Sequence, residues 1–164
     1  MKARAFPLAV ACLLAIASRT AGQDVDAERE SLRGLDGLRV QVEDLTDKAR
    51  EGGLTEAALH TYLEMRLRQA RIPILPKDEG GQSRAYLYLE VRAIPVRARG
   101  GWTYRLDLDV KQRACIRGGG SCPWLTTWDV GALVITPDNL ADHVRGVLVG
   151  YMDDLVNDYL AANP

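Results

Sequence analysis

The chain has 164 residues, a length that fits one ordinary domain. Hydrophobic residues make up 47% and charged residues 26%, a globular composition that excludes a disordered or fibrous protein. Lys and Arg number 21 against 22 for Asp and Glu, and the net charge of -1 argues against a nucleic-acid binder, which normally carries a basic surplus.

The first 22 residues have the layout of a secretory signal peptide. Two positive residues, Lys2 and Arg4, precede an apolar run over residues 5–17, which is too short to span a bilayer. A small-residue pattern ending at Gly22 favours cleavage there, with Gln23 as the new N-terminus. We therefore expect an exported protein, periplasmic or secreted.

Two alternatives for this leader remain open. Residues 15–17 offer a second small-residue cleavage pattern, and Cys12 suggests lipidation, although the residues before it lack the usual leucine. Cleavage after Gly22 removes three positive charges and no acid, which changes the net charge from -1 to -4. We expect no transmembrane span in the mature chain, because no second apolar run approaches membrane length.

Two cysteines remain in the mature chain, Cys115 and Cys122. Export and an even count favour a disulfide, and three glycines between the cysteines make the loop pliable. The spacing is neither a redox nor a zinc pattern. We predict a structural disulfide, with free thiols as the alternative.

A polar segment over residues 23–37, with a short helix, leads into the first predicted strand. That strand lies at residues 38–43, where apolar and polar residues alternate. Leucines at helical spacing predict a helix over residues 55–71, with Thr55 as its N-cap. Residues 72–76 contain two prolines and therefore form a short edge strand or an extended link.

Three longer strands are predicted over residues 85–93, 102–110 and 124–135, and a helix over residues 137–161 begins at Thr136 as its N-cap. With residues 38–164 as one domain, we predict an α+β fold. It is a two-layer sandwich in which two amphipathic helices pack on one face of a mostly antiparallel, five-stranded sheet.

The register of the first two long strands follows from keeping their apolar faces together. We predict that Arg92 lies opposite Asp107 and Tyr88 opposite Lys111. The alternative, shifted by two residues, places Glu90 opposite Asp107, a like-charged pair that disfavours it.

The polar face of these two strands is the candidate binding site, since tyrosine and arginine are favoured at interfaces. The alternative is an ordinary solvated face with cross-strand ion pairs. The candidate binding residues are Tyr86, Tyr88, Arg92, Arg105, Asp107, Lys111 and Arg113.

No catalytic, metal or cofactor motif is present. The two histidines, His60 and His143, stand without a nucleophile motif, and no phosphate-binding loop or zinc pattern occurs. We predict no catalytic residue, no metal and no cofactor.

Several short segments resemble a group of small exported bacterial proteins of unassigned function. The similarity lies in residues 32–45, 53–55, 66–70, 86–88, 127–128 and 158–163. It implies a bacterial envelope protein and supplies no catalytic residues. The order of elements also resembles small periplasmic α/β domains such as the N-terminal domain of TolB.

We expect a non-enzymatic binding or accessory module of the cell envelope, whose partner is a protein or a small ligand and not a nucleic acid. One alternative is a small hydrolase-type enzyme, which needs a histidine hydrogen-bonded to a carboxylate in a pocket. The other is a carrier of a small apolar ligand, held in a cavity that is lined by Trp102, Trp124 and Trp128, with the last two on one face of their strand.

Overall fold

The structure is a computed structural model that describes residues 25–76, 85–96, 100–115, 119–137 and 139–164. The predicted signal peptide, its cleavage sites and Cys12 lie outside the described residues. In the described part of the chain, no helix is long and apolar enough to cross a membrane.

Four strands form one mixed sheet, and helices accompany it, which confirms the α+β class. In spatial order the strands are β1 (Arg39–Val42), β2 (Ala85–Pro95), β3 (Trp102–Arg113) and β4 (Trp124–Thr136). β1 runs parallel to β2, and the other two pairings are antiparallel.

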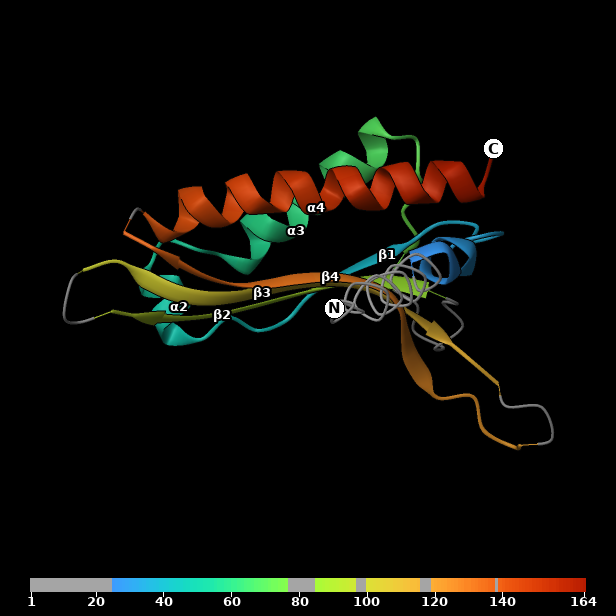
Figure 1. Cartoon of the computed structure of the whole chain (residues 1–164), viewed down its shortest axis with the longest axis horizontal. Helices are drawn as coiled ribbons and strands as arrows, with labels where there is room; N and C mark the ends of the chain where they lie inside the picture. Colours follow the sequence, from blue (N-terminus) through green and yellow to red (C-terminus); the bar gives the residue numbers. More distant parts are fainter. Residues whose placement is uncertain (1–24, 77–84, 97–99, 116–118, 138) are drawn as a thin grey trace, which may run out of the picture.

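The helices are α2 (Asp47–Glu51), α3 (Glu56–Gln69) and α4 (Leu140–Ala162), and a short helix covers residues 25–31. Figure 1 shows α4 lying along one side of the sheet, with α3 on the same side.

Within the described residues there are four strands, and the fifth predicted strand is reduced to a bridge. Leu38 pairs with Ile74 in an isolated parallel bridge, through bonds from the Leu38 N–H to the Pro73 carbonyl and from the Leu75 N–H to the Leu38 carbonyl. Pro73 and Pro76 lack the N–H groups that a longer ladder requires.

The core lies between the sheet and the helices. The predicted apolar faces are confirmed, because Leu87 and Leu89 of β2 and Leu106 and Leu108 of β3 are fully buried. They belong to one hydrophobic cluster with leucines of α3 and α4 such as Leu63, Leu67, Leu148 and Leu155.

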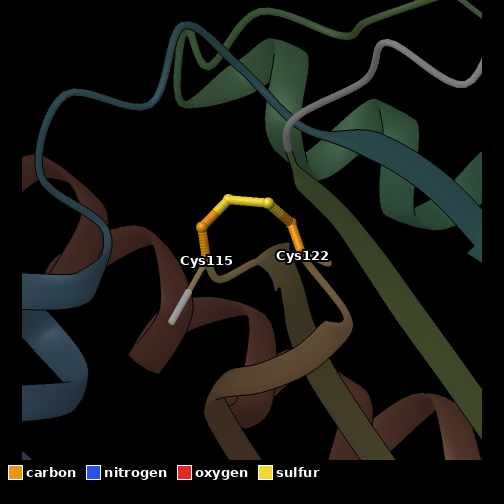
Figure 2. The surroundings of a disulfide bond; sticks show 2 residues. All are labelled: Cys115 and Cys122. Carbon is orange, nitrogen blue, oxygen red and sulfur yellow. A yellow bond between two sulfur atoms is a disulfide. The ribbon is translucent and has the colours of Figure 1, made fainter. Parts of the chain in front are cut away.

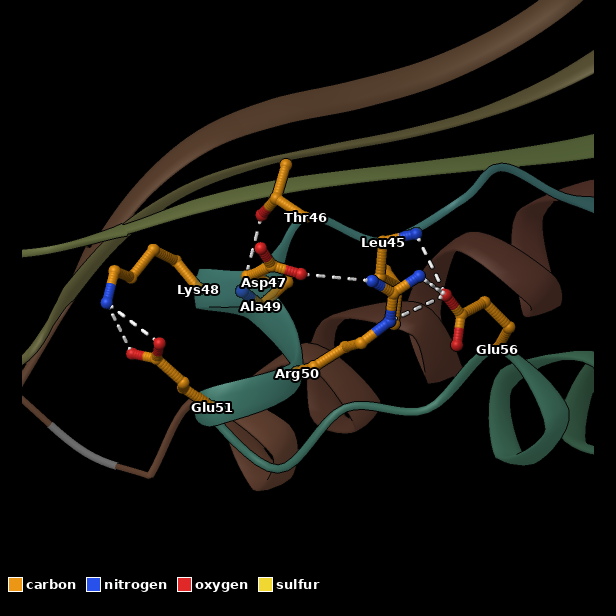
Figure 3. A network of polar contacts seen from close by, with 8 residues as sticks. All are labelled: Leu45, Thr46, Asp47, Lys48, Ala49, Arg50, Glu51 and Glu56. Carbon is orange, nitrogen blue, oxygen red and sulfur yellow. Dashed lines mark hydrogen bonds and ion pairs between the residues drawn. The ribbon is translucent and has the colours of Figure 1, made fainter.

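Helix α2 was not predicted, because its five residues are too few to show a periodicity. The Thr46 hydroxyl caps it by accepting a bond from the Ala49 N–H, and Ala49 is buried. Figure 3 shows how α2 is tied to the start of α3: Glu56 accepts hydrogen bonds from the Leu45 N–H and from the Arg50 guanidinium.

The structure confirms the predicted N-cap of α3 and not that of α4. Thr55 caps α3 as predicted, accepting from the Ala58 N–H at 3.2 Å. Thr136 was the wrong cap for α4, because it is the buried last residue of β4. Asn139 takes the role by accepting a bond from the Asp142 N–H.

The predicted register of β2 and β3 is wrong by two residues. Glu90 lies opposite Asp107, and Arg92 lies opposite Arg105. The hairpin turn decides this, since the Val96 N–H bonds to the Gly101 carbonyl at 2.9 Å.

Ion pairs between residues of the same strand offset the repulsion between the like charges that face each other on β2 and β3. Arg92 pairs with Glu90, and Arg105 pairs with Asp107 at 2.6 Å. The prediction considered only pairs across the two strands. Because Glu90 and Asp107 each pair with an arginine of their own strand, the repulsion between them no longer disfavours this register.

Trp124 and Trp128 lie on opposite faces of β4, contrary to the prediction. The ladder between β3 and β4 shifts between Val110 and Lys111, which face Trp128 and Thr126. This β-bulge leaves Thr127 as an extra residue and reverses the alternation beyond it. Trp128 is buried in the core, and its indole N–H donates to Asp158 of α4 at 3.0 Å.

The predicted disulfide between Cys115 and Cys122 is present (Figure 2), with a Cα–Cα distance of 4.2 Å. It joins the segments that leave β3 and enter β4, next to a bond from the Ala114 N–H to the Pro123 carbonyl.

Candidate functional site

The sheet face opposite α3 and α4, here called the outer face, carries all seven candidate binding residues. The even-numbered residues of β2 and the odd-numbered residues of β3 point to it, because the residues between them are buried in the core. A depression of about 490 Å³ opens on this face, lined by Glu90, Arg92, Arg105, Asp107, Asp109, Thr126 and Asp129.

One end of the outer face is aromatic and basic. The rings of Tyr86 and Trp124 meet edge to face with centroids 4.6 Å apart. The Lys111 ammonium lies 3.5 Å from the centroid of the Tyr88 ring, and the Arg113 guanidinium 5.2 Å from that of Trp124. Two cations on aromatic faces are cation–π contacts, which hold these side chains in place.

The Tyr88 hydroxyl donates a hydrogen bond to the carboxylate of Glu43, just beyond β1. Burial of Tyr88 raises its pKa, and the bond to Glu43 and the charge of that carboxylate raise the pKa further. Tyr88 is therefore held as a neutral phenol that donates to Glu43.

The centre of the outer face is acidic. Glu90 lies opposite Asp107, and Asp109 lies opposite Asp129. Burial raises the pKa of Asp109, and the nearby carboxylates of Asp129 and Asp107 raise it further, whereas Lys111 lowers it. The centre carries four carboxylates, of which Glu90, Asp107 and Asp109 pair with Arg92, Arg105 and Lys111 in turn.

The far end of the outer face combines arginine with apolar side chains. Ile94, Thr103 and Ile135 form one row across β2, β3 and β4, and Arg92, Arg105 and Leu133 form the next. Leu133 and Ile135 are 73% and 75% exposed. An apolar patch flanked by two arginines is typical of an interaction surface.

Sequence reasoning missed five contributors to this face: Glu43, Trp124, Asp129, Leu133 and Ile135. Trp124 was missed because nothing in the residue pattern marks the bulge at Thr127. Glu43 follows β1, and the other three belong to β4. Only the fold determines that β1 pairs with β2 and that β4 pairs with β3.

Among the described residues, neither histidine is hydrogen-bonded to a carboxylate. The His60 Nδ1 atom is 3.8 Å from the Glu64 carboxylate, beyond hydrogen-bond reach, although both line a groove of about 570 Å³ along β1. The His143 Nδ1 atom lies 2.6 Å from the buried Tyr104 hydroxyl, which is not a carboxylate.

Metal ligands do not gather in the described residues: no group of three or more His, Cys, Asp or Glu side chains there could hold a metal ion. The tryptophans also lie apart. Trp128 is in the core, Trp124 is on the outer face, and Trp102 is partly buried beside α2 and α4.

Comparison with known proteins finds no matching family model, no matching curated protein and no matching solved structure.

Proposed function

We propose that this chain is an exported, non-enzymatic binding module of the bacterial cell envelope, and that its outer face binds a protein partner. In this view the helices form a second layer behind the sheet and leave the outer face free. The observation that carries the proposal is the gathering of the seven candidate residues on one open face, with Trp124 and the exposed apolar residues of β4.

The chemistry of the outer face supports a protein as the partner. Aromatic and arginine side chains that become buried provide most of the binding energy at protein interfaces. One end of the outer face supplies Tyr86, Trp124 and Arg113, and the far end supplies Arg92 and Arg105. The acidic centre adds specificity, because it favours a partner with a cationic residue at that position. The face is wide and shallow, unlike the enclosed pockets that hold small ligands.

The disulfide supports export. Such bonds persist in oxidising compartments and are rare in the cytosol. Closure of the loop beyond β3 and β4 by Cys115 and Cys122 is therefore consistent with a chain that functions outside the cytoplasm.

Photo-crosslinking tests the proposal directly. A photoreactive amino acid replaces Arg92 on the outer face, and in a control variant it replaces Arg68 on α3. The two side chains are 75% and 64% exposed, and each pairs with a glutamate of its own element. In cells that export the protein, we expect a discrete protein adduct from position 92 and none from position 68.

A double substitution on the outer face, away from position 92, completes this experiment. Tyr88→Ala and Lys111→Ala together remove one aromatic–basic contact without touching position 92, and we expect them to reduce the adduct at least about tenfold. Adducts only from position 68, or an adduct that is unchanged by the double substitution, would refute the outer face as the binding surface.

A further inference from the structure

The β-bulge at Thr127 decides which residue of β4 stands beside Tyr86 on the outer face. In the observed ladder Trp124 lies opposite Arg113, with Thr127 as the extra residue. The Trp124 ring meets the ring of Tyr86 with centroids 4.6 Å apart, and the Arg113 guanidinium lies 5.2 Å from its centroid. The bulge therefore supplies the tryptophan at the aromatic and basic end of the outer face.

A straight ladder without the bulge is the competing arrangement. Trp128 keeps its place in both ladders, but without an extra residue Leu125 takes the position opposite Arg113. Side chains alternate between the two faces of a strand. Leu125 and Thr127 would then point to the outer face, and Trp124 to the opposite face, which packs against the helices and is here called the inner face.

The side chain of Gln112 holds the bulge from the inner face. Its amide group donates one hydrogen bond to the Thr127 hydroxyl at 2.7 Å and another to the Ser31 carbonyl at 2.8 Å. The Thr127 hydroxyl in turn donates to the Val110 carbonyl of β3 at 3.3 Å. Both amide protons and the hydroxyl proton therefore have an acceptor.

The Ser31 carbonyl is a fixed acceptor for Gln112. Ser31 ends the short N-terminal helix, and Arg29 of the same helix pairs with Asp158 of α4 at 2.8 Å. This ion pair attaches the helix to α4 without any contribution from Gln112. The amide is thus held between a helix on one side and the bulge on the other.

The contact between Gln112 and Thr127 is compatible only with the bulged ladder. Gln112 points to the inner face in both ladders, because the extra residue belongs to β4 and not to β3. In the straight ladder the Thr127 hydroxyl would lie on the outer face, across the sheet from the Gln112 amide. The contact therefore stabilises the bulged ladder relative to the straight one.

We propose that Gln112 and Thr127 are positioning residues for the binding surface, and that they act through the bulge to keep the Trp124 ring on the outer face. The inference rests on the proposed function, since Trp124 is one of the side chains offered to the partner. With Leu125 in its place, the partner would meet an aliphatic side chain, and Arg113 would lose its cation–π contact.

NMR of the isolated protein tests the positioning. Thr127→Val keeps the shape of the side chain but removes two of the three hydrogen bonds, which should shift the balance toward the straight ladder at least about tenfold. The nuclear Overhauser contact between the Trp124 and Tyr86 rings, assigned with Trp124→Phe, should then be lost. Thr127→Ser, which keeps the hydroxyl, should retain it.

Trp128 serves as an internal control for folding. Its indole N–H donates to Asp158, and its place in the sheet is the same in both ladders, so its signal should persist in Thr127→Val. Gln112→Leu leaves β4 unchanged in sequence and should have the same effect as Thr127→Val. A Trp124–Tyr86 contact that survives both substitutions would overturn the proposal. Loss of the Trp128 signal in both variants would also overturn it, because the two residues would then support the whole fold.

Photo-crosslinking from position 92 separates this inference from the proposed function. Thr127→Val should reduce the adduct as far as Trp124→Ala does, whereas Thr127→Ser should leave it unchanged. An adduct that persists in Thr127→Val after the Trp124–Tyr86 contact is lost would refute the role of these residues in binding. Absence of any adduct from the otherwise unsubstituted chain would refute the proposed function, and the NMR contact would still decide whether Gln112 and Thr127 position Trp124.

Discussion

Two adjacent glycines at the β2–β3 turn differ in what surrounds them. Gly100 and Gly101 have φ values of 70° and 92°, a region that other residues rarely adopt. A Cβ at Gly101 would lie 2.3 Å from the Thr136 carbonyl oxygen, whereas a Cβ at Gly100 would meet nothing within 4 Å. The turn that sets the register therefore packs tightly against the end of β4.

Alanine substitutions at these glycines should separate backbone strain from the steric clash. Gly100→Ala should cost about 1 kcal/mol of unfolding free energy, from left-handed strain alone. Gly101→Ala should cost about 3 kcal/mol or more, because Thr136 belongs to a strand and cannot move freely. Urea unfolding measures both, and equal losses would contradict the role assigned to Thr136.

At the scale of elements, Glu56 links α2 to α3 and should make stability depend on pH. Hydrogen bonds from Arg50 and from backbone N–H groups, Leu45 among them, lower its pKa to about 2. The ionised form is thus favoured by folding. Its contribution to stability is complete above the unfolded pKa, near pH 4.5, and is lost as the pH falls toward 2.

Glu56→Gln should therefore destabilise the protein at pH 7, and the difference from wild type should shrink as the pH falls from 4.5 toward 2. Unfolding curves at several pH values measure this. Glu51→Gln, which removes an exposed pair with Lys48, is the control and should cost less than about 0.5 kcal/mol. A Glu56→Gln effect that stays constant over this pH range would contradict the link.

The disulfide should stabilise another element, the β3–β4 hairpin. Closing an eight-residue loop stabilises by about 2.5 kcal/mol in the chain-entropy model. Replacing both Cys115 and Cys122 by serine should lower the unfolding free energy by roughly that amount. Non-reducing peptide mapping of the exported protein should find the two linked, and two freely alkylated thiols would refute the assignment.

For the whole molecule, the leader makes a prediction about the mature chain. The intact mass of the exported protein should match a chain that begins at Gln23. A mature form that retains residues 1–22 would contradict both the export prediction and the argument that export favours the disulfide.

Local residue patterns predicted much of this fold. Alternation identified the buried faces of β2 and β3, helical leucine spacing identified α3, and the cysteine pair identified the disulfide. These features depend on neighbours in the chain, so the residues themselves carry the information. The same alternation placed all seven candidate residues on one face.

The β2–β3 register, the bulge at Thr127 and the cap at Asn139 could not be read in this way. The register depended on a turn closed by Val96 and Gly101 and on ion pairs along the strands, which outweighed the repulsion between Glu90 and Asp107. The bulge turned Trp124 to the outer face and left Trp128 against Asp158 of α4. Sequence alone determined which residues of β2 and β3 are buried and which are polar, because that depends on local periodicity. Only the tertiary structure decided which polar residues meet, because that depends on contacts between distant strands.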